Sequence, residues 1–281
     1  MTNILVDIGN SALKWSSLGN MEKPRAYLHD SKSQLSSVLV SDLVKLSFEE
    51  AWACSVAQKS LTTQFEELVG RKGGKVHWLR AGDRFEGPLT MINEYDSPSR
   101  LGADRWFAAL GAASQYYGNS IVLVQFGTAT TVDEINFERD RYVFLGGRIA
   151  PGIDVMFKSL KERIPALNVS SGNLVDFPRN TEDAVTTGII ECQIGLIKNA
   201  VEKLKKKSDH APVIVVLTGG GIESYEALHR CAVDHLPRAH INTNLVLKGL
   251  ALEVQNHREK LLPIQVCVLL QQTEKSDLLR Q

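Results

Sequence analysis

The residues best suited to chemistry lie in two short turns, each at the end of an apolar run. The first turn is Gly9-Asn10-Ser11, with Asp7 just before it, and the second is Gly127-Thr128-Ala129-Thr130. Glycine lets backbone N–H groups approach an anion without interference from a Cβ atom, and the polar side chains add donors. Asp7 could hold Mg²⁺ directly or through water. Either turn alone is also consistent with an ordinary hairpin, but together they predict a site for a nucleotide polyphosphate.

A third glycine turn, Thr218-Gly219-Gly220, follows the apolar run 213–217 and precedes a segment with helical spacing. Adjacent glycines leave a flat backbone surface against which an adenine or a ribose could lie. The alternative is a loop whose glycines simply need positive φ angles. The chain contains neither a Walker A pattern nor Gly-x-Gly-x-x-Gly, which argues against the P-loop and dinucleotide-binding classes.

A candidate catalytic segment, Leu101-Gly102-Ala103-Asp104-Arg105-Trp106, begins a long apolar stretch with helical spacing. In a cleft with a nucleotide, Asp104 could accept a proton from a substrate hydroxyl. Arg105 could hold an acidic substrate through a two-pronged contact. The alternative is that Asp104 is a charge favoured by the helix dipole, with Arg105 as its surface partner.

The spacing of apolar residues predicts the strands and helices that must position these segments. Strands are expected where β-branched and apolar residues run together, and helices where apolar residues recur every three or four positions. The expected strands are 4–8, 13–18, 25–29, 51–56, 76–79, 121–126, 132–135, 142–149 and 213–217. The expected helices are 33–46, 60–69, 101–117, 156–161, 181–206 and 221–231, while 80–99 is expected to be mostly loop. This order is typical of an α/β fold.

The second half of the chain repeats the plan of the first. In both halves an apolar strand is followed by a polar residue, an apolar residue, glycine and small polar residues, which indicates an internal duplication. We expect two lobes, residues 1–117 and 118–256. Residues 257–281 form a tail with no assigned role, although 264–270 has strand character.

The chain resembles the type III pantothenate kinases, whose relatives include the Bvg accessory factor, over roughly residues 3 to 256. The segments that carry the resemblance, in the family's order, are Asp7 to Ser11, Tyr95 to Arg105, Phe126 to Asp133, Gly146 to Gly152, Asn180 to Ala184, and Thr218 to Gly220. The resemblance implies duplicated ribonuclease-H-like lobes of the acetate and sugar kinase/Hsp70/actin superfamily. It also implies ATP-dependent phosphorylation of pantothenate to 4'-phosphopantothenate, the first step of coenzyme A biosynthesis, in an active site at a homodimer interface.

The same resemblance assigns roles to individual residues. Asp104 would be the catalytic base. The residues around pantothenate would be Tyr95, Gly102, Arg105 and Thr181. The residues that bind ATP would be Asp7, Gly9, Asn10, Ser11, Lys14, Gly127, Thr128, Ala129, Thr130, Thr218, Gly219 and Gly220. Mg²⁺ would accompany ATP, with Asp7 as its ligand.

Gln125 departs from the family pattern. The family usually has Asp two residues before the glycine of the second phosphate turn, where it helps to hold a monovalent cation such as K⁺ or NH₄⁺, whereas this chain has Gln125. A carboxamide offers its carbonyl oxygen to a cation but carries no charge. The sequence therefore leaves the dependence on a monovalent cation open.

The composition narrows the class of function. Among 281 residues, 43% are hydrophobic, which is enough for a sizeable core, and 32 Lys and Arg balance 32 Asp and Glu. This balance favours neither nucleic acid nor a membrane as a partner. The four cysteines lack a Cys-x-x-Cys pair, as expected of reduced thiols, and Asp7 and Lys14 interrupt what would be the apolar part of a signal peptide. We therefore expect a cytoplasmic protein.

Two alternatives to a pantothenate kinase stay open. A regulator of the accessory-factor kind would keep nucleotide binding but have lost turnover at Gln125. A different kinase on the same fold is disfavoured by the Gly-Ala-Asp-Arg and Asn-Thr segments. Asp7, Asp104 and Arg105 are all present and favour the enzyme.

Overall fold

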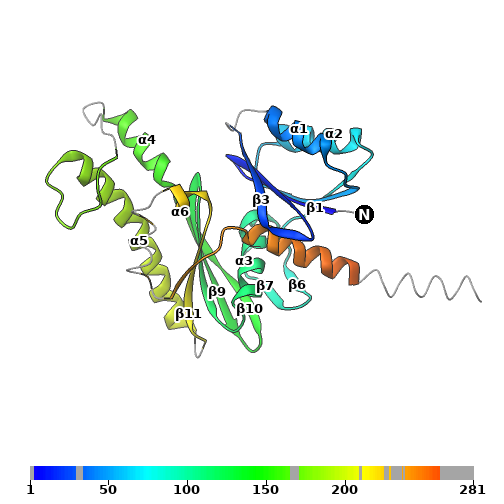
Figure 1. The fold of residues 1–281 in the computed structure, drawn as a ribbon. Coiled ribbons are helices and arrows are strands. Elements are labelled where there is room, and N and C mark those ends of the chain that lie inside the picture. Colours follow the sequence, from blue (N-terminus) through cyan, green and yellow to red (C-terminus); the bar gives the residue numbers. More distant parts are fainter. Residues whose placement is uncertain are drawn as a thin grey trace, which may run out of the picture.

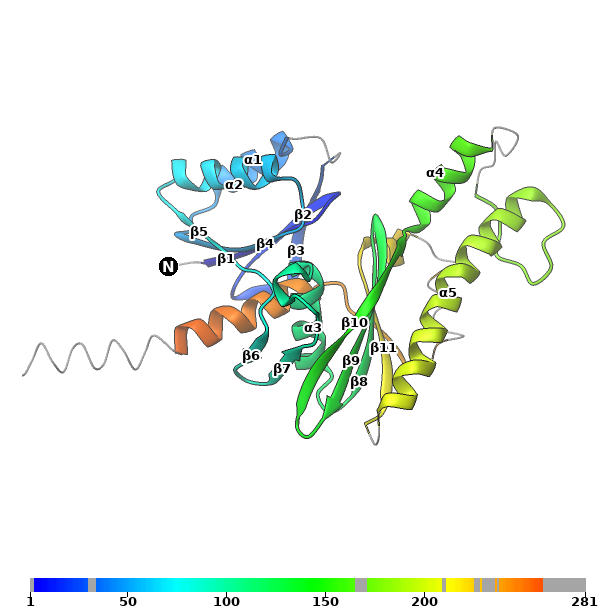
Figure 2. The same ribbon diagram turned by 180° about the vertical axis from the view of Figure 1, so that it is seen from behind.

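Two mixed sheets, one of five strands and one of seven, form the framework of the molecule (Figure 1). The structure is a computed structural model that describes residues 3–29, 34–164, 171–208, 211–224, 228, 236 and 238–259. Figure 2 shows the same molecule from behind, with the smaller sheet and its helices on one side of α3 and the larger sheet on the other.

The smaller sheet has the strand order β3-β2-β1-β4-β5. Its strands are β1 (Asn3–Ile8), β2 (Ala12–Ser17), β3 (Asn20–Leu28), β4 (Glu50–Ser55) and β5 (Lys75–Trp78). Side chains alternate along β1, so Ile4, Val6 and Ile8 pack with α1 (Ser37–Lys45) and α2 (Lys59–Arg71), the helices that cover one face. Leu5 points to the opposite face, toward the interior between the sheets.

The larger sheet has the order β12-β11-β8-β9-β10-β7-β6. Its strands are β6 (Arg84–Glu86), β7 (Thr90–Asn93), β8 (Ser120–Phe126), β9 (Ala129–Glu138), β10 (Arg141–Pro151), β11 (Val213–Thr218) and β12 (Ala239–Ile241). The last five strands of this sheet in the chain, β8 to β12, repeat the arrangement of β1 to β5. In each set, the first three strands are joined by two antiparallel pairings, and two parallel strands then follow on the other side of the first strand. The duplication predicted from the sequence is thus present in the topology.

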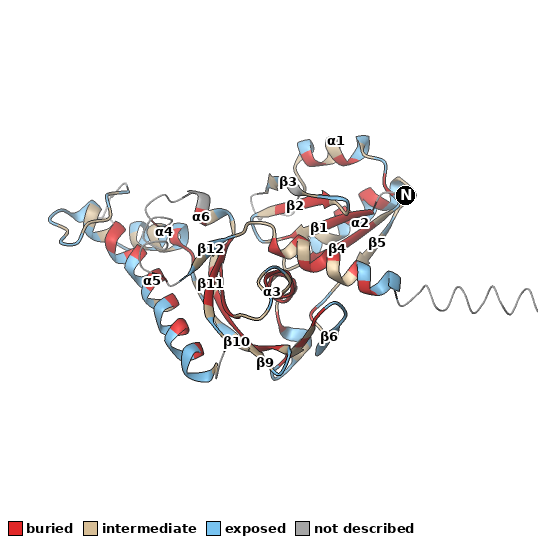
Figure 3. Ribbon diagram, turned by 60° about the horizontal axis from the view of Figure 1, so that its bottom comes forward, coloured by how far each residue is buried: buried red, intermediate tan, exposed pale blue. Residues whose placement is uncertain are grey.

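Helix α3 (Ala103–Gln115) lies between the two sheets and is almost entirely buried (Figure 3). It packs against the helix over residues 245–259 at two glycines. A Cβ atom at Gly111 would overlap the carbonyl oxygen of Leu245, and one at Gly249 would overlap that of Phe107. The two helix backbones therefore touch, and this contact holds α3 in a fixed position between the sheets.

Two further helices, α4 (Ile153–Arg163) and α5 (Thr181–Lys207), lie on the other face of the larger sheet. Val122 and Val124 of β8 face α5, whereas Ile121 and Leu123 face α3. The Asn180 side chain caps α5 by accepting a hydrogen bond from the Asp183 N–H at 2.8 Å. The remaining short elements are the 3-10 turn η1 (Pro98–Arg100) and α6 (Gly220–Ser224).

Most predicted elements are confirmed, but the expectation of a loop over 80–99 was wrong in part, because β6, β7 and η1 lie there. The two strands are only three and four residues long, and β7 is held by pairing with β10, which no local pattern reveals. Both strands lie before residue 118, where the second lobe is expected to begin, yet they extend the larger sheet. The lobe boundary itself stays a prediction. The expected helix 221–231 lies mostly outside the described residues, and so does the strand expected at 264–270.

We predict that Gly249→Ala destabilises the protein by about 3 kcal/mol, because overpacking must separate two backbones rather than move a side chain. Gly188→Ala is the control, since Gly188 lies in α5 with no atom within 4 Å of an added Cβ. That change should raise stability by up to about 1 kcal/mol through helix propensity. Urea unfolding followed by circular dichroism compares the two, and equal stability of both variants would contradict the helix contact.

Candidate active site

The two glycine turns, far apart in the sequence, meet in space. The Ser11 and Thr128 hydroxyls are hydrogen-bonded at 2.6 Å, and both residues are exposed. Each turn is closed by its glycine, because Gly9 N–H donates to the Ala12 carbonyl and Gly127 N–H donates to the Ala129 carbonyl, at 2.9 and 3.1 Å. Two turns of the same kind, one from each repeat, are therefore in contact, so one polyphosphate chain could bind to both.

The second turn is packed tightly from two directions. Gly152 N–H donates to the Thr128 carbonyl at 3.0 Å, and a Cβ at Gly152 would overlap the Gly127 carbonyl oxygen. Gly219 has a φ of +94°, and a Cβ atom at Gly219 would overlap the carbonyl oxygen of Phe126. The third turn thus lies directly against the second, next to a small hollow lined by Phe126, Gly127, Thr130, Ile153, Asp154 and Gly221. The Thr130 hydroxyl is buried and has no partner among the described residues, which leaves a donor for a ligand.

Asp7 lies at the end of β1, opposite Lys14 on β2 and Cys54 on β4. Burial, together with the negative charge of Asp104, raises the pKa of Asp7 to about 7, although Lys14 opposes the shift. The Cys54 thiol donates to Asp7 Oδ1 at 3.7 Å, and burial raises the pKa of that thiol well above its ordinary value. The thiol therefore stays protonated and remains a donor to the carboxylate.

Asp104 stands in the first turn of α3, where its side chain accepts a hydrogen bond from the Arg105 backbone N–H at 2.8 Å. Burial raises the pKa of Asp104, which increases its affinity for a proton. Gly102 makes the position possible, because a Cβ there would lie 2.7 Å from Asp104 Oδ1. The charge of Asp104 raises the pKa of Asp7, which lies two residues before Gly9 of the first turn.

Arg105 makes its two-pronged contact within the protein rather than facing solvent. Its Nε donates to both oxygens of the Asp133 carboxylate at 3.0 and 3.2 Å, and its Nη2 donates to Oδ1. Its Nη1 donates to the Tyr95 hydroxyl at 3.2 Å. Burial would lower the pKa of Arg105, but the hydrogen-bonded charge of Asp133 raises it, so Arg105 stays ionised. Burial raises the pKa of Asp133 to about 6, although the hydrogen bonds and charge of Arg105 oppose the shift. Gly147 covers the pair, because a Cβ there would overlap Asp133 Oδ1 and lie 2.7 Å from Arg105 Nη2.

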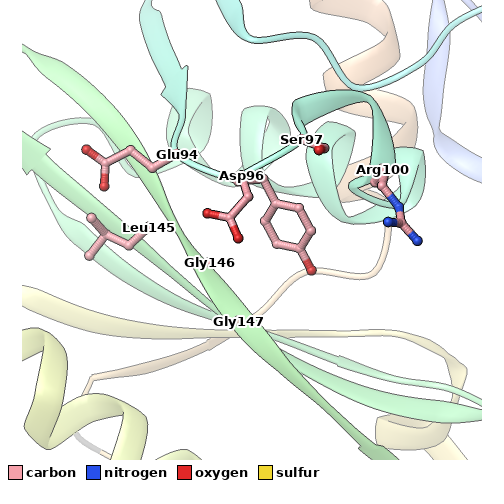
Figure 4. A pocket seen from close by; sticks show the side chains of 8 residues that line it. Glu94, Asp96, Ser97, Arg100, Leu145, Gly146 and Gly147 are labelled. Carbon is pink, nitrogen blue, oxygen red and sulfur yellow. The ribbon is translucent and has the colours of Figure 1, made fainter.

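A cavity of about 540 Å³ opens beside Tyr95 (Figure 4). This size is typical of a site for a small molecule. The residues that line it are Glu94, Tyr95, Asp96, Ser97, Arg100, Leu145, Gly146 and Gly147. Of the residues expected around pantothenate, Tyr95 lines the cavity, Arg105 bonds to Tyr95, and Gly102 lies beside Asp104.

Thr181 was expected to contact pantothenate, but within one chain it lies apart from the other residues expected around that substrate. It is exposed at the first position of α5, and α5 packs on the face of the larger sheet opposite α3.

Gln125 lies near the third turn, since it is the register partner of Thr218, and its carboxamide donates to the Thr131 hydroxyl at 3.5 Å. Within the described ranges no cluster of three or more His, Cys, Asp or Glu residues is arranged to hold a metal ion.

Comparison with known proteins gives the family. A family model described as type III pantothenate kinase matches residues 3–203. The chain belongs to the type III pantothenate kinase family. It is 34% identical over 255 residues to a Chromobacterium violaceum protein of that name, covering 90% of this chain and 99% of the relative. It is 31% identical over 251 residues to a namesake from Azoarcus sp. strain BH72, covering 88% and 89%.

Solved structures with the same fold also match most of the chain. A Campylobacter jejuni protein assigned to the Baf family of transcriptional activators matches 91% of this chain and 99% of its own, with TM-score 0.55 and 19% identity. A Sinorhizobium meliloti protein assigned as a 2-dehydro-3-deoxygalactonokinase matches 89% and 97%, with TM-score 0.50 and 13% identity. The expected α/β class is confirmed, the two sheets repeat one topology, and the fold is the one that these solved structures share. No helix among the described residues has the length and apolar character to cross a membrane.

Asp133, Gly147 and Cys54 contact residues of the candidate site but received no role from the sequence. Asp133 and Gly147 each belong to a segment that carries the family resemblance, but nothing in those segments links the two residues. Their relation to Arg105 depends on the register of β9 and β10, which pairs Asp133 with Gly147. Cys54 has no sequence signal at all, because its contact with Asp7 arises from the parallel pairing of β1 and β4.

The raised pKa of Asp7 predicts a cost in stability that depends on pH. The native state holds a proton at Asp7 up to about pH 7, while the unfolded chain releases it near its ordinary value of 3.8. Stability therefore falls as the pH rises from about 4 to 7, since the native state binds more protons there. Asp7→Asn should remove this loss and be more stable than the native chain by about 1–3 kcal/mol at pH 8, with little difference at pH 4.

Urea unfolding at pH 4 and pH 8, with EDTA and without nucleotide, measures this difference. Asp83→Asn makes the same charge change at an exposed position and should have no such effect. A native chain that is more stable than Asp7→Asn at pH 8 would contradict the desolvation of Asp7.

Proposed function

We propose that this chain transfers the terminal phosphoryl group of ATP to pantothenate, giving 4'-phosphopantothenate in the first step of coenzyme A biosynthesis. The observation that carries the proposal is the meeting of Ser11 and Thr128 beside the carboxylates of Asp7 and Asp104, in a chain of the type III pantothenate kinase family. We place the reaction in the cytoplasm.

In this proposal ATP lies across the three turns. The phosphates contact the turns at Gly9 and Gly127, whose backbone N–H groups and neighbouring hydroxyls supply donors. Lys14, opposite Asp7 on β2, contributes positive charge near the phosphates. The adenosine lies on the turn at Thr218, Gly219 and Gly220, which packs directly against Phe126.

Mg²⁺ fits this site through Asp7. The pKa of Asp7 is raised by burial and then by the charge of Asp104, so a nearby cation would stabilise its ionised form. Mg²⁺ commonly uses one or two carboxylates, waters and substrate phosphates rather than a cage of protein ligands. When bound, it would offset charge on the phosphate oxygens. A monovalent cation near Gln125 stays a prediction, because its carboxamide offers only a dipole.

Asp104 acts in this proposal as the base that orients the acceptor hydroxyl and takes its proton. Its raised pKa suits that task, because a base is most effective when its pKa lies near the working pH. The bond to the Arg105 N–H fixes the carboxylate on the first turn of α3, and the Arg105 side chain anchors that turn to Asp133. Catalysis then rests on positioning and electrostatics, as in other phosphoryl transfers.

We further propose that two copies of the chain form a homodimer, with Thr181 of one copy completing the pantothenate site of the other. Within one chain α5 lies on the face of the larger sheet away from α3, so Thr181 requires another route to the substrate. Two large apolar side chains are exposed: Phe177, four residues before Thr181, at 83%, and Ile149 on β10 at 66%. Exposed apolar surface of this kind supports an interface.

A regulator without turnover is the second candidate, favoured only by Gln125 in place of the usual Asp. The buried carboxylate of Asp104, which a regulator without turnover would not need, supports the kinase. Release of ADP by the purified chain, with pantothenate against a panel of other small alcohols, tests the proposal. ADP release dependent on pantothenate is expected, and nucleotide binding without it would favour the regulator.

We predict that Asp104→Asn lowers kcat by about 10²–10⁴ while ATP binding stays nearly unchanged, because the amide keeps the shape but cannot take the proton. Asp83→Asn is the control, because it makes the same change of charge at an exposed position. Rates of ADP release and calorimetric titration with an ATP analogue measure both properties, after circular dichroism confirms the fold. If the purified variant turns over at the native rate, Asp104 is only a helix-start charge.

We predict that native turnover varies little with K⁺ or NH₄⁺ and that Gln125→Asp introduces saturable activation by these ions. A formal charge at the end of β8 attracts a weakly hydrated cation, which in turn offsets phosphate charge next to Gly127. Initial rates in Tris buffer, with KCl or NH₄Cl added at constant ionic strength, measure the response. Strong saturable activation of the native chain, unchanged in Gln125→Asp, would refute this role of Gln125.

A further inference from the structure

His29, which directly follows β3, holds the first glycine turn at two points. Its backbone N–H donates to the Ser11 carbonyl at 2.9 Å. Its ring Nε2 lies 3.0 Å from the Gly9 carbonyl oxygen, and because a carbonyl oxygen can only accept, Nε2 carries the proton and donates it. The other ring nitrogen, Nδ1, is buried and has no partner among the described residues. Within that part of the chain, the bond to Gly9 is the one hydrogen bond of the ring.

The second repeat contains the counterpart of the backbone contact. Gly152 directly follows β10, as His29 directly follows β3, and each of these strands is the third of its repeat. The Gly152 N–H donates to the Thr128 carbonyl at 3.0 Å. In the first repeat the His29 N–H donates in the same way to the carbonyl of Ser11. Both turns are therefore held from equivalent places in the duplicated fold.

The side chain of His29 distinguishes the two places. A Cβ atom at Gly152 would overlap the Gly127 carbonyl oxygen, so the second repeat has no room for a side chain there. In the first repeat the imidazole occupies the equivalent position and bonds to the carbonyl of Gly9, the counterpart of Gly127. A side chain thus fixes the first turn, whereas close backbone packing fixes the second.

The bond from His29 also sets the direction of a peptide group. The Gly9 carbonyl and the Asn10 N–H belong to one trans peptide plane, so they point in opposite directions. Holding the carbonyl toward the imidazole therefore turns the Asn10 N–H away from His29. Among the described residues, no hydrogen bond uses the N–H of Asn10 or of Ser11, and both residues are exposed. Both N–H groups are thus available to an anion.

We propose that His29 is a positioning residue for the phosphates of ATP. This inference rests on the proposed function, in which the phosphates contact the first glycine turn. His29 acts through the turn and not by contact with a reacting group, because its hydrogen bonds hold the carbonyls of Gly9 and Ser11. Without the imidazole, the peptide between Gly9 and Asn10 is free to rotate and to present a carbonyl oxygen to the phosphates, which would repel it.

A purely structural role for His29 would have a different consequence. A histidine that only ties β3 to the hairpin of β1 and β2 would contribute to the free energy of unfolding, but not to the affinity for one of two substrates. Affinity for the nucleotide is therefore the quantity to measure. Pantothenate is the internal reference, because Tyr95 and Arg105, which are expected around it, lie on other elements.

The test compares two amides at position 29. Gln can place its side-chain nitrogen near the position of the histidine Nε2 and donate to the Gly9 carbonyl, whereas the shorter Asn cannot reach it. By calorimetry, His29→Asn should raise the dissociation constant of a non-hydrolysable ATP analogue with Mg²⁺ about three- to tenfold, because the bond that orients the donors is lost. His29→Gln should stay within about twofold of the native chain.

Steady-state kinetics give the matching comparison. In His29→Asn the KM for ATP should rise with the dissociation constant, while the KM for pantothenate stays within about twofold of the native value. His29→Leu fills the space of the ring without a donor and should behave like His29→Asn, so it decides the outcome if circular dichroism shows that His29→Asn does not fold. His257→Asn is the control, because it makes the same change at an exposed position near the end of the helix over residues 245–259. It should leave both KM values unchanged.

The results separate this inference from the proposed function. A native chain that binds the analogue but does not phosphorylate pantothenate would refute the proposed function, and the binding comparison would still report the effect of His29→Asn. A native chain that does not bind the analogue would overturn both. Unchanged affinity in the folded His29→Asn or His29→Leu variant, an equal loss in His29→Gln, or an equal rise in both KM values would overturn only the role of His29.

Discussion

The hydrogen bond between Ser11 and Thr128 is the contact on which the proposed site depends. It joins turns that belong to different sheets, and it can form only because β1–β2 and β8–β9 are equivalent hairpins whose turns face each other. Gly152 and Gly219 then pack against the second turn without side chains, so the backbone around it stays close and its donors stay accessible. Because each lobe supplies one of the two turns, the proposed phosphate site forms only where the two lobes meet.

The carboxylates beside these turns illustrate how function and stability oppose each other. Asp7 is buried near Asp104, and the resulting desolvation disfavours the charged form. The buried ion pair of Arg105 and Asp133 has a different task, since it ties the first turn of α3 to β9. Asp104, the preceding residue, is therefore held in position by its neighbour's side chain. A base fixed in this way needs little reorganisation during the reaction.

Much of this arrangement could be predicted from the sequence, because it follows from local order. The repeated order around Gly9 and Gly127 predicts the duplication, and the ordered segments predict the family. The partner of Arg105 could not be predicted in the same way. The sequence favours a contact with an acidic substrate, whereas the structure pairs Arg105 with Asp133, and that choice depends on how α3 packs on β9.

The strands β6 and β7 show a second limit of prediction. Runs of three and four residues have too little periodicity to indicate a strand, and β7 is held by pairing with β10. Their addition to the sheet matters for the site, because the cavity residues Glu94 to Ser97 follow β7 directly. Likewise, the position of Thr181 on the far face of the larger sheet depends on the packing of α5 and not on any feature of its own segment.

The central claim, that both turns hold one nucleotide, is tested most directly by calorimetric titration of a non-hydrolysable ATP analogue. The comparison uses the native chain, Ser11→Ala, Thr128→Ala and the double variant. Each single change should weaken binding by about 0.5–1.5 kcal/mol, the usual contribution of a hydrogen bond, and the two effects should not add, because both hydroxyls act on one ligand and on each other. Loss of affinity in one single variant with none in the other would contradict the account, since one turn alone would then bind the phosphates.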